Sequence, residues 1–283
     1  RDDLGLPEEQ VKQYAARNSL TMSLGGAAEP ALSPAGAPVA EPAPVVVAVE
    51  AAPVAEADAP VGAHPRPGVV RAAEKQTFVL VHGATAGGWE WKRTGQFLTE
   101  DGHTVYRATL TGLGERMHLN STNITLQTHI DDVVNLILFE DLHDVVLTGH
   151  SYGGMVITGV MDRVPDRIKH VVFLDAAVPG DGQSLWDLFG GRGMDPKRFA
   201  DGFMQVPWVK ADAKPPYNVK QSIGCFNQPV SYQNPAAKAL PVTYVAFVPK
   251  DKSAEERAKT DKSWQRAVSR GWTIRTFPGG HVA

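Results

Sequence analysis

Residues 149–153 read Gly-His-Ser-Tyr-Gly, between an apolar run at 144–148 and a helix-compatible run at 155–161. A strand that ends in this pattern must turn sharply into a helix, and the glycines remove the Cβ atoms that would clash in the turn. Ser151 would then be exposed at a helix N-terminus, where unpaired N–H groups favour developing negative charge. The pattern predicts a nucleophilic serine, and its simpler alternative is a serine that only caps the helix.

A serine is a weak nucleophile near neutral pH, so it needs a base nearby and a carboxylate that holds this base in the right tautomer. His281 is the preferred base because it directly follows the last predicted strand. Two aspartates, Asp251 and Asp175, also follow predicted strands. We expect Asp251 to be the acid, because the later loop commonly supplies it in such an arrangement. Asp175 is the alternative acid, and would otherwise stabilise the loop that follows it.

Acyl transfer also needs hydrogen-bond donors for the oxyanion that forms in the transition state. The backbone amides of Tyr152, directly after the serine, and of Ala84, in the loop His82-Gly83-Ala84, are the expected pair. Large aromatic residues between the predicted strands could line an apolar substrate pocket, and their alternative role is simple packing. These residues are Trp186, Phe189 and Trp208, together with Phe203 and Phe226.

The remaining histidines and the single cysteine have simpler interpretations. We expect His82 to tie its loop to the backbone, the His150 side chain to point away from the site, and His129 to lie on a helix surface. No histidine pair has a spacing such as H-E-x-x-H, so no metal and no cofactor is predicted. Cys225 alone excludes an intrachain disulfide and is most simply a packing residue.

Short apolar runs alternate with helix-length segments from Gln76 onward. This alternation predicts an α/β fold with a mainly parallel sheet, helices on both faces, and ligands beyond the carboxyl ends of the strands. A Gly-, Pro- and Trp-rich segment at about 179–240 interrupts it and is predicted to be a cap. The predicted strands are 77–81, 104–108, 144–148, 170–174, 242–248 and 273–277, and the predicted helices are 90–99, 130–138, 155–161 and 255–269.

The N-terminal part of the chain differs in composition from this domain. Residues 1–23 contain one short predicted helix, and residues 24–72 are rich in Ala and Pro, which favours extended, disordered chain. We therefore expect a helical segment at 1–23, a disordered linker at 24–72 whose partner is unknown, and one α/β domain at 73–283.

Composition excludes several classes of function. The 283 residues carry a formal net charge of −3, so no basic excess favours nucleic acid. No apolar run reaches the roughly twenty residues that a membrane span requires. The sequence predicts a soluble protein and slightly favours the cytoplasm without fixing the compartment.

From Phe78 to His281 the sequence resembles the α/β-hydrolase superfamily, and within it bacterial EstC-like esterases related to plant methylesterases and hydroxynitrile lyases. The resemblance rests on residues 79–84, 87–91, 110–116, 149–154 and 173–176. It implies a carboxylic-ester hydrolase that uses a small-molecule ester and no cofactor. It also implies a triad of Ser151, Asp251 and His281, with Ala84 and Tyr152 as the oxyanion amides.

Two alternatives to an esterase stay open on the same fold. Hydroxynitrile lyases of this group typically carry a threonine where Gly83 stands and a lysine where Val282 stands, so both positions favour the esterase. A catalytically silent ligand-binding module is the second alternative. The aromatic content of the predicted cap suggests small or medium hydrophobic esters as substrates.

Overall fold

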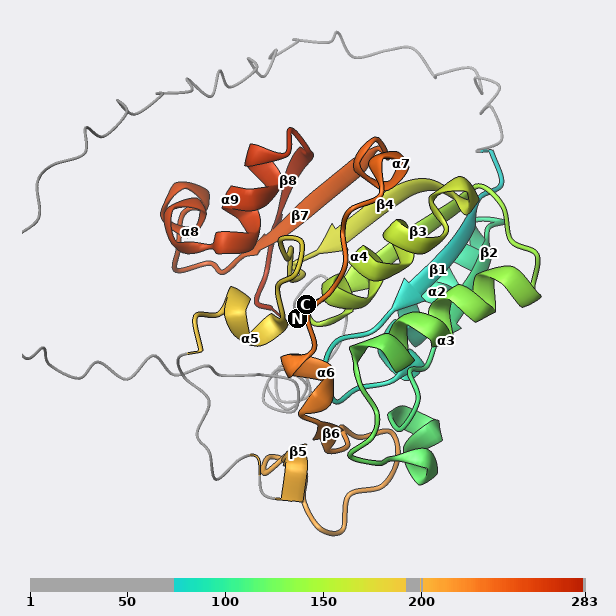
Figure 1. Cartoon of the computed structure of the whole chain (residues 1–283), viewed down its shortest axis with the longest axis vertical. Helices are drawn as coiled ribbons and strands as arrows, with labels where there is room; N and C mark the ends of the chain where they lie inside the picture. Colours follow the sequence, from blue (N-terminus) through green and yellow to red (C-terminus); the bar gives the residue numbers. More distant parts are fainter. Residues whose placement is uncertain (1–73, 192–198, 200, 282–283) are drawn as a thin grey trace, which may run out of the picture. The chain divides into compact units, whose positions relative to one another are not determined.

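The computed structural model describes residues 74–191, 199 and 201–281, so the predicted helix at 1–23 and the linker at 24–72 lie outside the described residues. One six-stranded sheet has the order β2-β1-β3-β4-β7-β8 (Figure 1), and each neighbouring pair is parallel. Its strands are β1 (Thr77–Val81), β2 (Thr104–Ala108), β3 (Val145–His150), β4 (Ile168–Leu174), β7 (Val242–Val248) and β8 (Thr273–Pro278).

Helices connect these strands and cover the sheet. In Figure 1, α3 (Leu126–Phe139) and α4 (Gly153–Arg163) lie in front of the sheet and α2 (Lys92–Glu100) lies behind it. Short 3-10 helices accompany them: η1 (Gly88–Trp91), η2 (Gly114–Leu119) and η3 (Pro165–Arg167). The predicted helix at 90–99 therefore begins as η1 and continues as α2. The predicted α/β class with a mainly parallel sheet is confirmed.

The central strands are apolar along their length because both of their faces are covered. Val79, Val145, Leu147 and Phe173 have no exposed surface, and they belong to one continuous core with α3 and α4. Parallel strands that are buried on both faces typically have apolar residues at nearly every position. The core thus fixes the positions of the strand ends at which the loops after β1, β3 and β4 begin.

The helix predicted at 255–269 is two helices, α8 (Ala254–Thr260) and α9 (Lys262–Ser269). Asp261 separates them in an extended conformation, with φ −85° and ψ 104°. Its side chain accepts hydrogen bonds from the backbone N–H groups of Ser263 and Trp264, as an N-cap does. The continuous periodicity concealed this break, because Asp261 can cap a new helix as readily as it can sit on a helix surface.

Between β4 and β7, where the cap is expected, the described chain forms only short elements. They are α5 (Leu185–Leu188), β5 (Phe203–Met204), β6 (Gln221–Ser222), α6 (Gly224–Asn227) and α7 (Pro235–Lys238), with β5 and β6 antiparallel. This insertion is tied to the loop after β1: the Thr85 N–H donates to Gln221 Oε1 and the Val219 N–H donates to the Thr85 carbonyl, both at 2.7 Å.

None of the helices in the described ranges combines the length and the apolar character that a membrane crossing would require.

Candidate active site

The turn at Ser151 has the strand, turn and helix context that the five-residue pattern predicts. β3 ends at His150, α4 begins at Gly153, and Ser151 itself has φ +53°. A Cβ atom on Gly149 would lie 2.8 Å from the Gly153 carbonyl oxygen, and one on Gly153 would lie 2.8 Å from the Val81 carbonyl oxygen. Only glycine fits at both positions, so the backbone can close tightly around the serine.

Three non-glycine residues with positive φ follow three neighbouring strands of the sheet. They are Thr85 (φ +63°) after β1, Ser151 (φ +53°) after β3 and Asp175 (φ +46°) after β4. Each such conformation costs roughly 1–3 kcal/mol and persists only where the surroundings hold it in place. The carboxyl ends of these three central strands therefore each lead into a strained residue, with Ser151 on the middle strand; Asp141, Asp144 and Asp201 also have positive φ elsewhere in the described chain.

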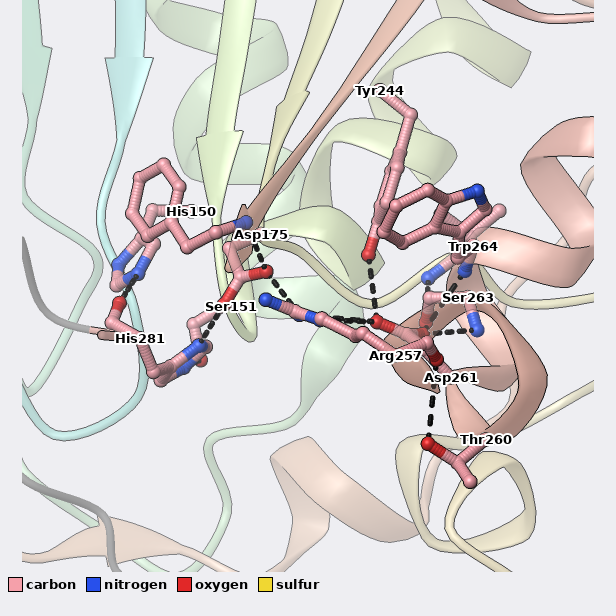
Figure 2. Close-up of polar contacts among 12 residues, drawn as sticks. His150, Ser151, Asp175, Tyr244, Arg257, Thr260, Asp261, Ser263, Trp264 and His281 are labelled. Atoms are coloured by element: carbon pink, nitrogen blue, oxygen red, sulfur yellow. Dashed lines mark hydrogen bonds and ion pairs between the residues drawn. The ribbon is translucent and has the colours of Figure 1, made fainter. Parts of the chain in front are cut away.

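The side chains of Ser151, His281 and Asp175 form one hydrogen-bonded chain (Figure 2). Ser151 Oγ lies 2.9 Å from His281 Nε2, and His281 Nδ1 lies 2.6 Å from Asp175 Oδ2. A carboxylate can only accept, so the proton of a neutral His281 sits on Nδ1 and the Nε2 lone pair faces the serine hydroxyl. The arrangement can remove a proton from Ser151.

Asp251, the acid preferred from the sequence, is not the partner of His281. It lies exposed in the turn between β7 and α8, while Asp175 makes the 2.6 Å contact with the imidazole. In this structure the alternative acid, Asp175, and not the preferred Asp251, lies behind the imidazole of His281. Both aspartates follow neighbouring strands, so the order of residues along the chain could not separate them.

Asp175 is buried and fully engaged. Its Oδ1 accepts the Phe247 N–H at 3.1 Å and also contacts Arg257 Nη2. Burial acts to raise the pKa of Asp175, but the hydrogen bond from His281, the charges of His281 and Arg257, and the Phe247 amide together hold this pKa below its ordinary value. The carboxylate is thus ionised at neutral pH and ready to orient His281.

The loop after β1 orients the Ala84 amide. His82 Nδ1 lies 2.8 Å from the Gly83 carbonyl oxygen, while the Leu110 N–H donates to His82 Nε2 at 3.1 Å, which fixes the proton on Nδ1. Burial lowers the pKa of His82 to about 4, so the ring is neutral. In a trans peptide the carbonyl and the next N–H point in opposite directions, so the Ala84 N–H is aimed away from His82. Ala84 and Tyr152 both line the cavity beside Ser151.

Glu90 supports the same loop, a contact that the sequence did not indicate. Its Oε2 accepts the Gly83 N–H at 3.2 Å. Burial raises the pKa of Glu90 to about 7, against the opposing effects of the Gly83 amide and of His281. Both polar groups of the Gly83 backbone are therefore held, one by His82 and the other by Glu90.

His150 holds the loop that carries His281, which corrects the expectation that its side chain points away. Its Nε2 donates to the His281 carbonyl oxygen at 2.8 Å, and its ring stacks on Phe247 with 6.3 Å between centroids (Figure 2). Burial, and next the charge of His281, lower the pKa of His150 to about 4. The ring is thus a neutral donor with a fixed partner. The signal available in the sequence was only its place next to Ser151.

His129 is buried rather than on a helix surface. Its Nδ1 lies 2.9 Å from the Tyr152 hydroxyl oxygen, and its Nε2 lies 3.0 Å from the Thr111 carbonyl oxygen. A ring that donates to the carbonyl must accept from the Tyr152 hydroxyl, so His129 is neutral, and burial lowers its pKa to about 4. This contact anchors Tyr152, whose backbone amide is an expected oxyanion donor.

Cys225 is buried, as a packing residue would be.

A cavity of about 450 Å³ opens beside Ser151 and His281. Its apolar wall comes mainly from the insertion: Leu185, Trp186, Leu188, Phe189, Met204 and Phe226. Trp186, Phe189 and Phe226 thus lie where a substrate-pocket role needs them. Phe203 and Trp208 are not among the described lining residues, and Phe203 instead packs under the ammonium of Lys220. The aromatic composition could not separate lining residues from packing residues.

The opposite wall of the cavity is polar and comes from α8 and α9, with Arg257, Thr260, Asp261 and Lys262. Within the described ranges, no group of three or more His, Cys, Asp or Glu side chains is placed to hold a metal ion. The chemistry that these residues can perform by themselves is proton transfer and nucleophilic attack.

Comparison with known proteins gives the site a context. A model of the alpha/beta hydrolase family matches residues 78–283. A carbendazim hydrolyzing esterase from Nocardioides sp. is 55% identical over 111 residues, which cover 39% of this chain and 46% of that protein. Methylesterase 2 of Arabidopsis thaliana is 36% identical over 107 residues, which cover 37% of this chain and 41% of that protein. The chain spans less than half the length of these two relatives.

Solved structures share the fold over a larger part of the chain. An extracellular alpha/beta-hydrolase from a Paenibacillus species, described as a structural and functional homologue of tobacco salicylic acid binding protein 2, aligns with a TM-score of 0.59 and 25% identity. The alignment covers 74% of this chain and 92% of that chain. The resemblance to esterases and plant methylesterases that the sequence motifs indicate is confirmed. The family model matches most of the chain, and strand β3 of the parallel sheet leads directly into the turn at Ser151. This chain therefore belongs to the alpha/beta hydrolase family.

Proposed function

We propose that this protein is a serine hydrolase that cleaves carboxylic esters through an acyl-enzyme on Ser151. The observation that carries the proposal is the chain of two hydrogen bonds from Ser151 Oγ to His281 Nε2, at 2.9 Å, and from His281 Nδ1 to Asp175 Oδ2, at 2.6 Å. A nucleophile, its base and an orienting carboxylate in this order are what acyl transfer to a hydroxyl requires.

In the first half-reaction, Ser151 Oγ attacks the ester carbonyl carbon while its proton passes to His281 Nε2. The carbonyl oxygen becomes an oxyanion, and the backbone N–H groups of Ala84 and Tyr152 donate to it. One donor of this kind contributes about 3 kcal/mol. The carbon–oxygen bond to the alcohol then breaks, and the His281 proton moves to the departing oxygen, which leaves the acyl group on Ser151.

In the second half-reaction, a water molecule attacks the acyl carbon and gives its proton to His281. The bond to Ser151 Oγ breaks, the proton returns to Oγ, and the free carboxylic acid departs. Asp175 holds Nδ1–H throughout and stabilises the imidazolium that forms twice in the cycle.

The cavity supports esters with an apolar acyl or alcohol group as the substrate class. Its insertion wall is aromatic and aliphatic, and 450 Å³ suits a small or medium ligand. The names of the relatives, a carbendazim hydrolyzing esterase and a methylesterase, support the same class. Carbendazim and simple aromatic methyl esters are therefore the substrates to test first.

A single variant tests the nucleophile. We expect wild-type protein to hydrolyse p-nitrophenyl butyrate and Ser151→Ala to lose almost all of this activity, about 10⁶-fold in kcat when the nucleophile acts with its base as a unit. Ser231→Ala is the matched control, because Ser231 Oγ bonds Asp162 on an exposed surface, and it should retain wild-type rates.

Mass spectrometry after treatment with a fluorophosphonate locates the reactive serine directly. The label is expected on the peptide that contains Ser151, and it should be absent in Ser151→Ala. Ester hydrolysis that survives this substitution would remove the nucleophile. A folded wild type that releases hydrogen cyanide from cyanohydrins without ester turnover would instead favour a lyase.

A further inference from the structure

Arg257 lies behind Asp175, on the side opposite to His281. The two oxygens of this one carboxylate are divided between the two partners: Oδ2 faces His281 Nδ1 at 2.6 Å, and Oδ1 contacts Arg257 Nη2 (Figure 2). The Asp175 side chain is 2% exposed and that of Arg257 is 19% exposed. A cation therefore stands one carboxylate away from the proposed base, and both side chains of this ion pair are mostly buried.

Arg257 is itself held in place by the break between α8 and α9. Its Nε and Nη2 donate to Asp261 Oδ2 at 3.3 and 3.1 Å. The other oxygen of Asp261 caps α9 through the amides of Ser263 and Trp264, and the Tyr244 hydroxyl also donates to Asp261 Oδ2 at 3.3 Å. The guanidinium is thus fixed between two carboxylates, one on each side.

This arrangement has two physical consequences. A buried carboxylate that faced only a neutral imidazole and the Phe247 amide would lack a compensating charge, so Arg257 helps Asp175 to stay ionised and in position. The positive charge also opposes the formation of an imidazolium at His281, because it cancels part of the Asp175 field. Arg257 should therefore lower the basicity of His281 relative to an Asp–His pair without a cation.

Other titratable groups also lie close to His281. His150, from the end of β3, is neutral because burial lowers its pKa to about 4. Glu90, from η1, has its pKa raised by burial to about 7 and is an acid whose titration His281 affects. Asp261 and Tyr244 interact with Arg257, and Tyr244 also interacts with Asp175.

We infer that Arg257 is a positioning residue of the hydrolase site, which fixes the Asp175 carboxylate opposite His281 and offsets its negative charge. This inference rests on the proposed function only in that His281 is the base. The acid was expected in the segment after β7. This segment instead contributes Arg257, the cation that holds the Asp175 carboxylate.

The first test is the pH profile of kcat/KM for p-nitrophenyl butyrate, whose acid limb reports the pKa of the base in the free enzyme. Arg257→Gln should lower kcat/KM about 10- to 100-fold, since the acid is no longer held in place. Without the positive charge the negative charge of Asp175 beside the base is no longer offset, so the acid limb should move to higher pH. Arg257→Lys keeps the charge and should keep the limb near its wild-type position.

Two further variants make the test decisive. Arg266→Gln is the matched control, because Arg266 is a partly buried arginine of α9 that donates to the Val178 carbonyl oxygen and not to Asp175; its acid limb should not move. Asp261→Asn keeps the cap of α9 but leaves the Arg257 charge less compensated, so the limb should move down. If Arg257→Gln does not fold, the direction in which the acid limb moves in Asp261→Asn tests the inference by itself.

A second readout does not require turnover. In protein with ¹⁵N-labelled histidine, the His281 ring signals, assigned by their loss in His281→Gln, should change with pH at a higher pH in Arg257→Gln than in wild type. Identical His281 titrations in Arg257→Gln and Arg266→Gln, or an upward shift in Asp261→Asn, would overturn the inference. A wild type without esterase activity but with the expected shift would overturn the proposed function and leave the role of Arg257 standing.

Discussion

The loop after β4 and the turn after β7 start from neighbouring strands at the same edge of the sheet, and each begins near an aspartate. Asp175 has positive φ, a side chain that is 2% exposed, and contacts with His281, Arg257 and the Phe247 amide. Asp251 lies exposed in its turn. The difference shows that a strand-end carboxylate becomes part of the site only where the surrounding chain supplies donors and excludes water.

The largest expected effect separates the two aspartates. Asp175→Asn should lower kcat about 10⁴-fold, because an amide cannot hold His281 in the required tautomer. Steady-state hydrolysis of p-nitrophenyl butyrate measures the loss, and a thermal melt separates it from unfolding, since the same change removes a partner of Arg257. A loss of less than tenfold would mean that His281 does not depend on this carboxylate.

The next effect concerns stability against pH. The region around β3 encloses three histidines, His82, His129 and His150, each with a pKa lowered by burial to about 4. The unfolded state binds these protons at higher pH than the folded state does, so the free energy of unfolding should fall as the pH drops from 6.5 toward 4. Each site contributes about 3 kcal/mol at most.

Glu90 acts in the opposite direction. Its pKa is raised to about 7, so its contribution to stability is largest at low pH and is lost as the pH rises through 7. Glu90→Gln removes this compensation and should make the loss of stability between pH 6.5 and 4 steeper. Urea unfolding at several pH values measures both slopes. A flat dependence in the wild type would contradict the neutral, buried state of the three histidines.

A smaller effect is expected at His150, which joins the Ser151 turn to the His281 loop. His150→Phe keeps an aromatic ring beside Phe247 but removes the donor to the His281 carbonyl oxygen. Loss of one hydrogen bond of about 1.4 kcal/mol predicts a roughly tenfold lower kcat. His150→Gln retains a donor and should recover part of the rate. Equal rates in the two variants would show that the hydrogen bond is not what matters.

The smallest effect is expected at Asp251, the exposed aspartate of the pair. Asp251→Asn should change kcat/KM less than about twofold and the melting temperature only slightly, because substitutions of exposed residues usually change stability by less than about 0.5 kcal/mol. The same assay and melt used for Asp175→Asn provide the measurement. A large loss of activity with an unchanged fold would restore Asp251 as the acid and place the structural assignment in error.

Much of the fold could be predicted because it depends on local patterns. The segments predicted at 77–81, 104–108 and 242–248 are the strands β1, β2 and β7 with the expected bounds, because short runs rich in β-branched and aromatic residues favour strands. The division of the helix predicted at 255–269 was missed, because Asp261 caps α9 through contacts that the periodicity does not record.

The site could be predicted only in part. Ser151 and His281, which the structure brings within 2.9 Å of each other, are marked in the sequence by a five-residue pattern and by a place after the last strand. The contacts that hold them were not identified. His150 was expected to point away from the site, the contact of Glu90 was not anticipated, and Trp208, expected in the pocket, is not among the residues described as lining the cavity. All of these depend on side-chain directions, and a linear pattern does not specify them.

By itself, the sequence determined the class of fold and the turn that exposes Ser151, because residue types within a few positions control strand, helix and turn formation. Tertiary structure alone decided which aspartate meets His281. These two residues are 106 positions apart, and Arg257 is 82 positions from the acid that it holds. Contacts over such separations follow from how the strands and the α8–α9 break pack together, and no local preference encodes them.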